Sequence, residues 1–156
     1  MVAEGRQAPD FELESDTGEP VRLSQFRGRP VVLYFYPRDD TAGCTAQACE
    51  FRDDYAEYEQ RDAVILGVSP DNVDAHMRFR EKYGLPFRLL ADPDHRVAEL
   101  YGAWGEKTSY GKKTVGLIRS TFVIDADGRV LHAMRGVRPQ GHSRQVLLAL
   151  PDEPRL

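Results

Sequence analysis

The sequence predicts an α/β fold in which a central mixed β-sheet is flanked by helices. Two short apolar runs rich in β-branched residues, Val31–Tyr36 and Ala63–Val68, stand on either side of a helical segment, as in a βαβ unit with buried parallel strands. Two further runs, Ser120–Ile124 and Val130–Met134, flank the turn-forming sequence Asp125-Ala126-Asp127-Gly128 and predict a β-hairpin. A parallel pair and a hairpin in one chain indicate a mixed sheet with helices layered on it.

An N-terminal β-hairpin is expected before the βαβ unit. The segments Phe11–Leu13 and Val21–Leu23 alternate apolar and polar residues, and the turn-rich sequence Asp16–Pro20 joins them. The segment Ser24–Gly28 then forms a short connecting turn. The hairpin therefore extends the sheet ahead of the first long strand.

The first strand of the βαβ unit should end at Pro37, because proline has no N–H to donate to a neighbouring strand. A loop follows, and Thr41 is a favoured N-cap residue. We therefore expect a helix over Ala42–Gln60, followed by the parallel strand at Ala63.

The second half of the chain contains shorter elements. Asp71 is expected to cap a helix that ends at Tyr83, because Gly84 and Pro86 follow in the usual order at a helix C-terminus. The apolar side of this helix should be Val73, Met77 and Tyr83, with His76 and Phe79 beside it. The remaining expected elements are a strand over Phe87–Leu90, a helix over Pro93–Tyr101, a polar loop over Gly102–Lys113 and a last helix over Ser143–Leu150.

Length and composition indicate one soluble domain over residues 1–156. The chain is 41% hydrophobic and 29% charged, and no apolar run approaches a membrane span. The net charge is −4, with 21 basic residues scattered among 25 acidic ones, so we expect no binding to nucleic acid or to a membrane. The residues Met1–Gly5 resemble neither a signal peptide nor a transit peptide, and we expect a cytoplasmic protein.

Both cysteines of the chain, Cys44 and Cys49, lie in the helix predicted after Thr41. Cys44 falls in the first turn, where unpaired N–H groups and the positive end of the helix dipole favour a thiolate over a thiol. The thiolate is the reactive form of cysteine, so Cys44 is a candidate nucleophile. In a reducing compartment, a pair of cysteines is more often catalytic or metal-binding than structural.

The helical periodicity also permits a second interpretation. One apolar stripe contains Cys44, Ala48, Phe51, Tyr55 and Tyr58, so Cys44 could be an inert core residue. The position of the cysteine favours the functional interpretation, because it follows the carboxyl end of a sheet strand, where open α/β sheets bind ligands.

The motif Pro37-x-x-x-Thr41-x-x-Cys44 resembles the peroxiredoxin signature. Its extension, Cys44-Thr45-x-Gln47-x-Cys49-x-Phe51-Arg52-Asp53, resembles the Q-type branch, also called bacterioferritin-comigratory proteins. The likeness continues through Ala8-Pro9-Asp10-Phe11, Gly67-Val68-Ser69, Leu85-Pro86-Phe87 and Arg119-Ser120-Thr121-Phe122-Val123-Ile124-Asp125. One departure is Ala42, where many relatives have proline, a residue that is favoured at the first position of a helix. The resemblance implies a thioredoxin-like (peroxiredoxin) fold with an N-terminal β-hairpin extension.

The resemblance also implies a thiol-dependent peroxidase and a role for each site residue. Cys44 would attack the peroxide and become a sulfenic acid, which would condense with Cys49 into an intramolecular disulfide. The Thr41 hydroxyl, the N–H groups of the first helical turn and Arg119 would stabilise and orient the reacting groups. Pro37 would shield the sulfur and shape the pocket.

Arg119 has a second interpretation. Without the resemblance, it would be a solvated charge near Lys112 and Lys113. At the start of the strand Ser120–Ile124, however, its guanidinium could reach across to the first βα loop. A fixed fork of donors with a permanent charge is what a thiolate and a polarised peroxide require, and lysine cannot supply the same geometry.

The substrates and partners follow from the resemblance alone. Hydrogen peroxide and small organic hydroperoxides are the expected substrates, and thioredoxin or glutaredoxin is the expected reductant. We expect a monomer or, at most, a weak homodimer. No cofactor is expected, and no metal, because the four histidines show no metal-binding spacing: His76, His95, His132 and His142.

Other classes of protein fit the sequence less well. A thioredoxin-type disulfide oxidoreductase would have two residues between its cysteines, whereas four separate Cys44 from Cys49. A cysteine phosphatase would have a basic residue six positions after its nucleophile, where this chain has Glu50 or Tyr55. A redox-sensing or chaperone-like binding module on the same fold remains open as a non-enzymatic alternative.

Overall fold

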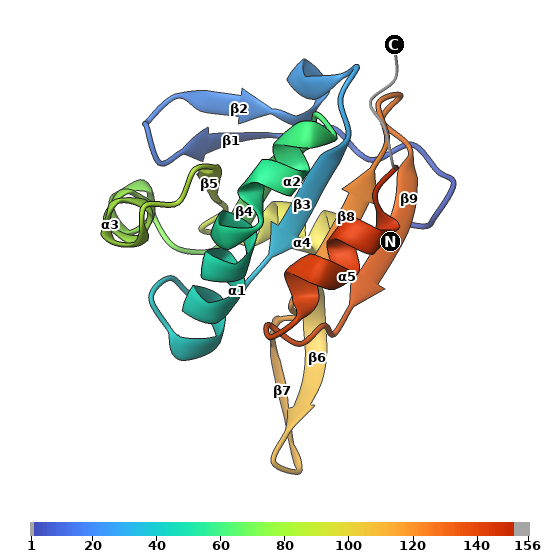
Figure 1. Cartoon of the computed structure of the whole chain (residues 1–156). Coiled ribbons are helices and arrows are strands. Elements are labelled where there is room, and N and C mark those ends of the chain that lie inside the picture. Colours follow the sequence, from blue (N-terminus) through green and yellow to red (C-terminus); the bar gives the residue numbers. More distant parts are fainter. Residues whose placement is uncertain (1, 152–156) are drawn as a thin grey trace.

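The computed structural model of the chain describes residues 2–151 and is built around a seven-stranded mixed sheet of order β2-β1-β5-β4-β3-β8-β9 (Figure 1). Its strands are β1 Glu12–Ser15, β2 Pro20–Arg22, β3 Val31–Phe35, β4 Val64–Ser69, β5 Arg88–Ala91, β8 Ser120–Ile124 and β9 Val130–Arg135. The strands β3, β4 and β5 are parallel, whereas β1 on β5 and β8 on β3 are antiparallel. The predicted βαβ unit, mixed sheet and N-terminal hairpin are confirmed.

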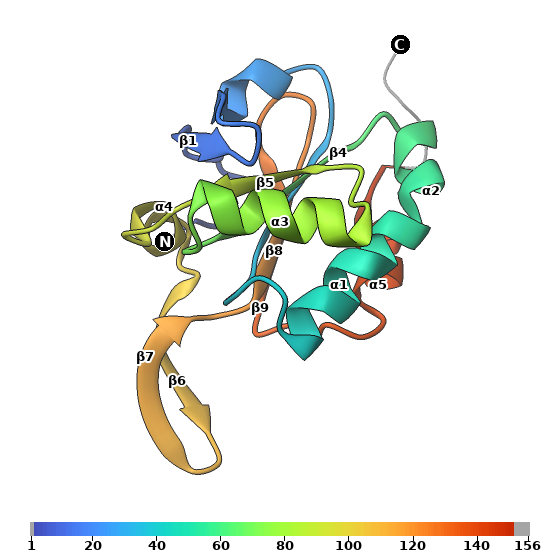
Figure 2. The same cartoon turned by 90° about the vertical axis from the view of Figure 1, so that its left-hand side faces the viewer.

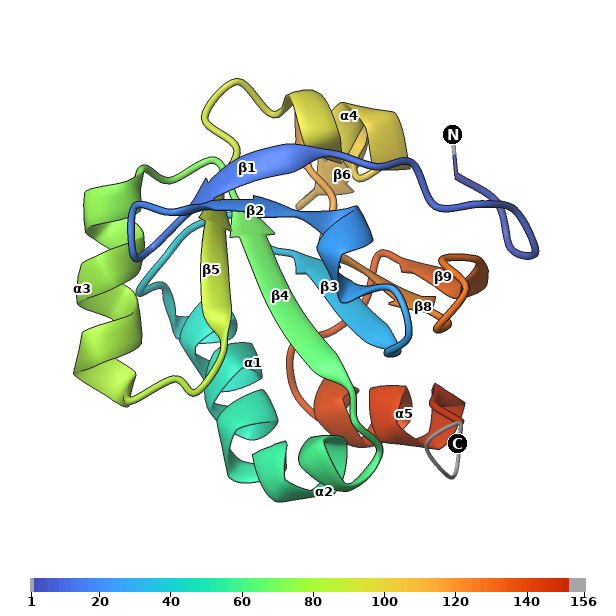
Figure 3. The same ribbon diagram turned by 90° about the horizontal axis from the view of Figure 1, so that it is seen from above.

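Helices cover both faces of the sheet. They are α1 Ala42–Asp53, α2 Tyr55–Gln60, α3 Val73–Tyr83, α4 Arg96–Tyr101 and α5 His142–Ala149, and a short 3-10 helix spans Leu23–Phe26. Figure 3 shows α1, α2 and α5 on one side of the sheet and α4 on the other. Among the described residues, the helices are too short or too polar to cross a membrane.

The strand β3 divides the interior into two clusters, because its side chains alternate between the faces of the sheet. Val31, Leu33 and Phe35 pack with α4 and the N-terminal hairpin. On the other face, the alternate residues Val32 and Tyr34, with Tyr36 beyond the strand, pack against α1, α3 and α5. Cys44 belongs to this second cluster. The face of β3 that carries tyrosines is therefore the one on which the candidate nucleophile lies.

The segment 2–8 lies along β9, an edge strand of the main sheet. The N–H of Gly5 donates to the Val130 carbonyl at 2.7 Å, and the Val130 N–H donates to the Arg6 carbonyl at 2.9 Å. Further along the strand, the Ala133 N–H donates to the Glu4 carboxylate and Arg135 donates to the Val2 carbonyl. The backbone groups of Val130 and the N–H of Ala133 are therefore already hydrogen-bonded to this segment.

The helix predicted over Ala42–Gln60 is instead two helices, α1 and α2, which meet at Asp54. Asp54 has φ −92° and ψ 5°, and its carboxylate accepts a hydrogen bond from the Ser143 hydroxyl of α5 at 2.8 Å. Aspartate is a weak helix former with a side chain that readily bonds elsewhere. The contact with Ser143, which is distant in the sequence, thus holds Asp54 at the break between α1 and α2. Helical periodicity in the sequence does not reveal this break.

The prediction that Asp71 caps the next helix was wrong by one residue. Asn72 is the N-cap of α3, and its side chain accepts from the Ala75 N–H at 2.9 Å. The carboxylate of Asp71 accepts instead from the Ser69 hydroxyl and from the Asp39 N–H. The predicted C-terminus is confirmed, with Gly84 in the left-handed region at φ 60°.

The buried side of α3 also differs from the prediction. His76 and Phe79 are buried in this helix, whereas Met77 is 48% exposed. The apolar face thus centres on residues that were expected to lie beside it. The orientation of α3 places His76 next to the loop after β3, where the imidazole has polar partners.

The segment Gly102–Lys113, predicted as a polar loop, is largely a β-hairpin of β6 Trp104–Ser109 and β7 Lys112–Leu117. Figure 2 shows it extending away from the main sheet. Tyr110 and Gly111 both have positive φ, 52° and 79°, as a two-residue type I′ turn requires. Most of β7 is exposed, so the hairpin lacks the apolar alternation by which strands are recognised.

Candidate active site

Cys44 is the third residue of α1, and its side chain is 1% exposed. The helix begins after Thr41, which has extended backbone angles, and its carbonyl accepts the Thr45 N–H at 2.8 Å. The sulfur therefore lies beside the first-turn N–H groups, at the positive end of the helix dipole. The N-terminus of a helix can stabilise negative charge on a molecule bound beside it.

Sheet pairing explains how Arg119 reaches this helix. The strand β8 runs antiparallel to β3, and Ser120 pairs with Phe35, the last residue of β3. Arg119, one residue before β8, therefore lies at the carboxyl end of β3, where the loop to α1 begins. Its guanidinium donates from Nη2 to Cys44 Sγ at 3.3 Å and from Nη1 to Gln47 Oε1 at 2.5 Å.

Gly43 makes room for this contact. A Cβ atom at Gly43 would lie 3.3 Å from Arg119 Nη2 and 3.4 Å from Pro139 Cγ, a tighter fit than most side chains tolerate. The glycine thus allows the guanidinium to approach the first turn of α1. The interpretation of Arg119 as a solvated charge is not supported by this position.

Thr41 and Pro37 lie in the loop 37–41 that leads into α1. Thr41 is at the predicted N-cap position, but its hydroxyl donates to the Arg38 carbonyl at 3.0 Å and makes no capping bond to the helix. The hydroxyl oxygen retains lone pairs that can accept a hydrogen bond from a bound molecule. Pro37 follows β3 and is partly buried.

Cys49 lies in the same helix as Cys44, and both thiols are free. Residues five apart in an α-helix have Cα atoms about 8.5 Å apart, from the rise and rotation per residue. A disulfide requires a Cα separation below about 7 Å. The two cysteines can therefore bond only if part of α1 unwinds.

Two buried residues beside Cys44 had no predicted role in the site. Gln47 is fully buried and accepts from Arg119, and its position three residues after Cys44 is the signal that could have indicated it. The Tyr34 hydroxyl is buried without a partner among the described residues. Burial, with the nearby charge of Cys44, raises the pKa of Tyr34, so this hydroxyl stays protonated. Gly67 accommodates the ring, since a Cβ there would lie 2.9 Å from Tyr34 Cζ.

One group of side chains among the described residues has the donor types that hold a metal ion: Asp39, Asp71 and His76, whose atoms lie within 4.8 Å of one another. They come from the loop 37–41, from the loop that follows β4 and from α3, so sequence spacing could not reveal the group. Their facing atoms are joined by hydrogen bonds to each other and to Tyr36 and Ser69.

A buried cysteine at a helix N-terminus, in contact with an arginine and at the end of a sheet strand, defines a thiol-dependent enzyme on a thioredoxin-like fold. Residues 5–133 match the model of the AhpC/TSA family, and the chain belongs to that family. The predicted resemblance to peroxiredoxins, and to their Q-type branch, is confirmed.

Relatives and solved structures agree with this assignment. The chain is 47% identical over 148 residues to peroxiredoxin Bcp of Bacillus subtilis, covering 95% of this chain and 94% of the relative. It is 43% identical to peroxiredoxin Bcp of Escherichia coli, with 92% of each chain covered.

Among solved structures, a PrxQ mutant of Xylella fastidiosa has a TM-score of 0.88 at 33% identity, covering 95% of this chain and 94% of that one. The bacterioferritin comigratory protein of Xanthomonas campestris, solved in work on its alkyl peroxide reduction activity, has a TM-score of 0.84 at 37% identity, covering 89% and 88%. The chain is thus a thiol peroxidase, and the non-enzymatic alternative is not favoured.

Proposed function

We propose that this chain, acting as a single domain of residues 1–156, reduces hydrogen peroxide and small organic hydroperoxides at Cys44. The observation that carries the proposal is the 3.3 Å contact between Arg119 Nη2 and Cys44 Sγ at the N-terminus of α1. The permanent cation of Arg119 and the first-turn N–H groups can stabilise charge that develops on the peroxide oxygens as the O–O bond breaks.

In the first step, the Cys44 thiolate attacks one peroxide oxygen. The O–O bond breaks and the attacked oxygen stays on Cys44, which becomes a sulfenic acid. The other oxygen takes up the proton that the thiol released and leaves as water or an alcohol. The Thr41 hydroxyl oxygen accepts a hydrogen bond from the peroxide, and Pro37 limits access of water to the sulfur. Gln47 holds the second arm of the Arg119 guanidinium in position.

In the second step, the Cys49 thiol attacks the sulfenic sulfur, and water leaves as the disulfide forms. The helical distance between the two residues requires the first turns of α1 to unwind. Ala42 in place of proline, together with Gly43 and Thr45, makes this start of the helix less stable than an alanine-rich one. A thioredoxin or glutaredoxin dithiol then exchanges with the disulfide and restores both thiols.

The family implies a peroxide substrate and a thioredoxin-type reductant. The cytoplasm, which keeps such reductants in their dithiol form, is the proposed location. We further propose a monomer or a weak homodimer, since all the residues assigned to the reaction come from one chain.

A turnover assay tests the proposal. Purified protein is given thioredoxin, its reductase and NADPH, and the oxidation of NADPH is followed with hydrogen peroxide and with tert-butyl hydroperoxide. A glutaredoxin system with glutathione forms the second arm. Turnover that requires the protein and either reductant is expected. The proposal would be contradicted if neither reductant supported turnover of either peroxide.

A further inference from the structure

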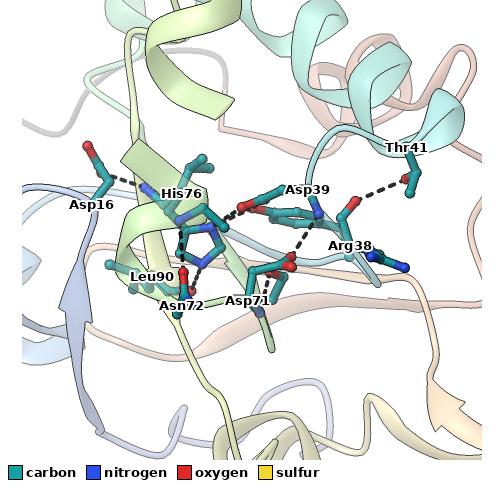
Figure 4. Close-up of polar contacts among 12 residues, drawn as sticks. Asp16, Arg38, Asp39, Thr41, Asp71, Asn72, His76 and Leu90 are labelled. Carbon is teal, nitrogen blue, oxygen red and sulfur yellow. Dashed lines mark hydrogen bonds and ion pairs between the residues drawn. The ribbon is translucent and has the colours of Figure 1, made fainter. Parts of the chain in front are cut away.

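A buried polar cluster joins the loop 37–41 to α3. The carboxylate of Asp39, in the loop, lies 2.6 Å from Nδ1 of His76, in α3 (Figure 4). The other ring nitrogen, Nε2, lies 2.9 Å from the Leu90 carbonyl of β5. The side chains of His76 and Asp39 are 0% and 6% exposed, so water does not compete for these contacts.

The partners of His76 determine where its protons lie. A carbonyl oxygen can only accept, so Nε2 must donate to Leu90. In a neutral ring Nδ1 would then be a bare acceptor, yet it faces a carboxylate oxygen of Asp39. Two acceptors cannot hydrogen-bond without a proton between them. One proton must therefore lie between Asp39 Oδ2 and His76 Nδ1.

Tyr36 does not supply this proton. Its hydroxyl donates to the other carboxylate oxygen, Asp39 Oδ1, at 2.5 Å, while it is 3.4 Å from His76 Nδ1. Burial raises the pKa of Tyr36, which keeps the hydroxyl proton on the tyrosine. The titratable groups around the ring are thus Tyr36, Asp39 and, behind them, Asp71.

The same loop is held at two further points. The Asp39 N–H donates to Asp71 Oδ2 at 2.8 Å, and Asp40 accepts from Lys82 Nζ and from the Tyr83 hydroxyl, each at 2.8 Å. Asp40 has a positive φ of 59°, which costs free energy in a residue other than glycine and persists only when neighbours hold it. The helix α3 thus fixes the last turn of chain before Thr41.

We propose that Asp39 and His76 share a buried proton and act as positioning residues for Cys44. Resting on the peroxidase mechanism above, this pair holds the loop 37–41 and keeps the first turn of α1 formed, so that the sulfur stays beside Arg119. Loss of the pair frees the start of α1. Peroxide attack then slows, because the donors around the sulfur are no longer aligned. Disulfide formation speeds up, because the unwound state is more populated.

The first experiment separates these two rates by rapid quenching with a thiol-blocking reagent and mass spectrometry. His76→Phe fills the space of the ring but removes both hydrogen bonds. Its rate of sulfenic acid formation should fall roughly tenfold, and its rate of conversion to the disulfide should rise several-fold. Asp39→Ala should behave alike. Asp39→Asn should recover most of both rates, because the amide can donate to a neutral Nδ1 and still accept from Tyr36.

The matched control is Asp16→Asn. Asp16 follows β1 and is 6% exposed. It forms an ion pair at 2.9 Å with Arg80, which lies in α3 as His76 does, so it holds α3 to the end of β1 rather than to the loop 37–41. It should lower stability while changing neither rate more than twofold. Equal effects of the control and His76→Phe, or unchanged rates in His76→Phe, would overturn the positioning role. If the parent protein failed to consume peroxide, the proposed function would be at fault instead.

The shared proton has its own spectroscopic test, which needs no activity. In protein labelled with ¹⁵N-histidine, at neutral pH, the parent should show a strongly downfield proton resonance from the Asp39–His76 pair. The resonance should be absent from His76→Phe and Asp39→Asn and present in Asp16→Asn. Its absence from the parent, or a change on adding Zn²⁺ that marks the cluster as a metal site, would contradict a proton-sharing pair.

Discussion

The two halves of helix α1 are held by different kinds of contact. The first half is held through the sulfur of Cys44, to which Arg119 donates, and through Gln47 beside it. The second half is held at Glu50, which accepts from the Gly141 N–H at 3.0 Å, and just beyond the helix at Asp54, which accepts from the Ser143 hydroxyl of α5. Cys49 lies between these halves and is partly buried.

This difference indicates which cysteine moves. In the proposed mechanism, oxidation leaves Cys44 as a neutral sulfenic acid, and we expect this change to weaken the contacts of the first half and to leave those of the second half unchanged. Cys44 should therefore travel towards Cys49, while the chain after Cys49 keeps its place against α5. The first half of α1 should thus respond to oxidation of Cys44, whereas the second half should keep the helix fixed against α5.

Replacing the sulfur of the first half should have the largest effect. Cys44→Ser should retain less than about one per cent of peroxidase activity, because an alcohol is barely ionised at neutral pH. The measurement is peroxide consumption at a fixed protein concentration, with circular dichroism to show that the fold is intact. Substantial activity in a folded Cys44→Ser protein would mean that another residue is the nucleophile.

Changing the cation beside the sulfur should have the next largest effect. Arg119→Lys keeps the charge but loses the donor fork that reaches both Sγ and Gln47, and we expect a fall of roughly 10²-fold in the second-order rate constant with peroxide. The matched control is Arg96→Lys, at an exposed position in α4, which should keep the parent rate. Equal rates in both variants would indicate that Arg119 is a solvated surface charge with no role in the reaction.

The second cysteine should affect turnover but not the first reaction. Cys49→Ser should still consume one equivalent of peroxide at the parent rate, because attack requires only Cys44. Turnover with thioredoxin should fall by about tenfold or more, since no intramolecular disulfide can form. Mass spectrometry should find Cys44 as a sulfenic or more highly oxidised acid. Normal turnover would show that Cys49 does not resolve the sulfenic acid.

Hydrogen exchange should distinguish the two halves directly. In the reduced protein, the amides of residues 45–58 should be protected. After one equivalent of peroxide, protection should be lost from the start of α1 to about Asp53, because the amides of residues 50–53 donate to carbonyls in the unwound turns. It should be retained from Asp54 onwards, where the Asp54 N–H donates to the Glu50 carbonyl. Loss over the whole of α1 and α2 would contradict the anchoring role of α5, and no change would contradict unwinding.

A smaller effect, on the pH dependence of stability, should come from α5, the helix that holds the second half of α1. Burial lowers the pKa of His142, at the start of α5, from its ordinary value of 6.5. The folded protein therefore binds this proton less readily than the unfolded chain, so its contribution to stability is present above pH 6.5 and lost as the pH falls through the folded pKa. Free energies of unfolding measured between pH 7 and 5 should decrease, by at most about 1.4 kcal/mol per pH unit from this residue. His142→Asn should flatten that slope; an identical slope would exclude His142 as its source.

The parts of the site that were predicted from sequence depend on local signals. The apolar run of β3, the proline that ends it, Thr41 and the first-turn cysteine are all neighbours in the chain. The positions of these residues in strand, loop and helix are confirmed. The side-chain bond of Thr41 could not be predicted, because its hydroxyl can donate to the preceding loop as readily as cap the helix.

The parts that could not be predicted depend on pairing between distant segments. Arg119 reaches Cys44 only because β8 lies antiparallel to β3 with Ser120 opposite Phe35. Its position in the chain also fitted a solvated charge near Lys112 and Lys113, and the resemblance decided between the two interpretations. His76 and Asp39 are likewise brought together by the packing of α3. The hairpin of β6 and β7 was missed because its strands face solvent and carry no apolar alternation.

The segment along β9 bears on self-association. An edge strand with unpaired N–H and carbonyl groups can template a second chain, in dimers joined edge to edge or in fibrils. Here Gly5, Arg6 and Glu4 already bond to Val130 and Ala133. A contact between two molecules through this edge would first have to displace that segment. A segment of the same chain thus covers the edge strand β9 and hinders its pairing with a strand of a second molecule.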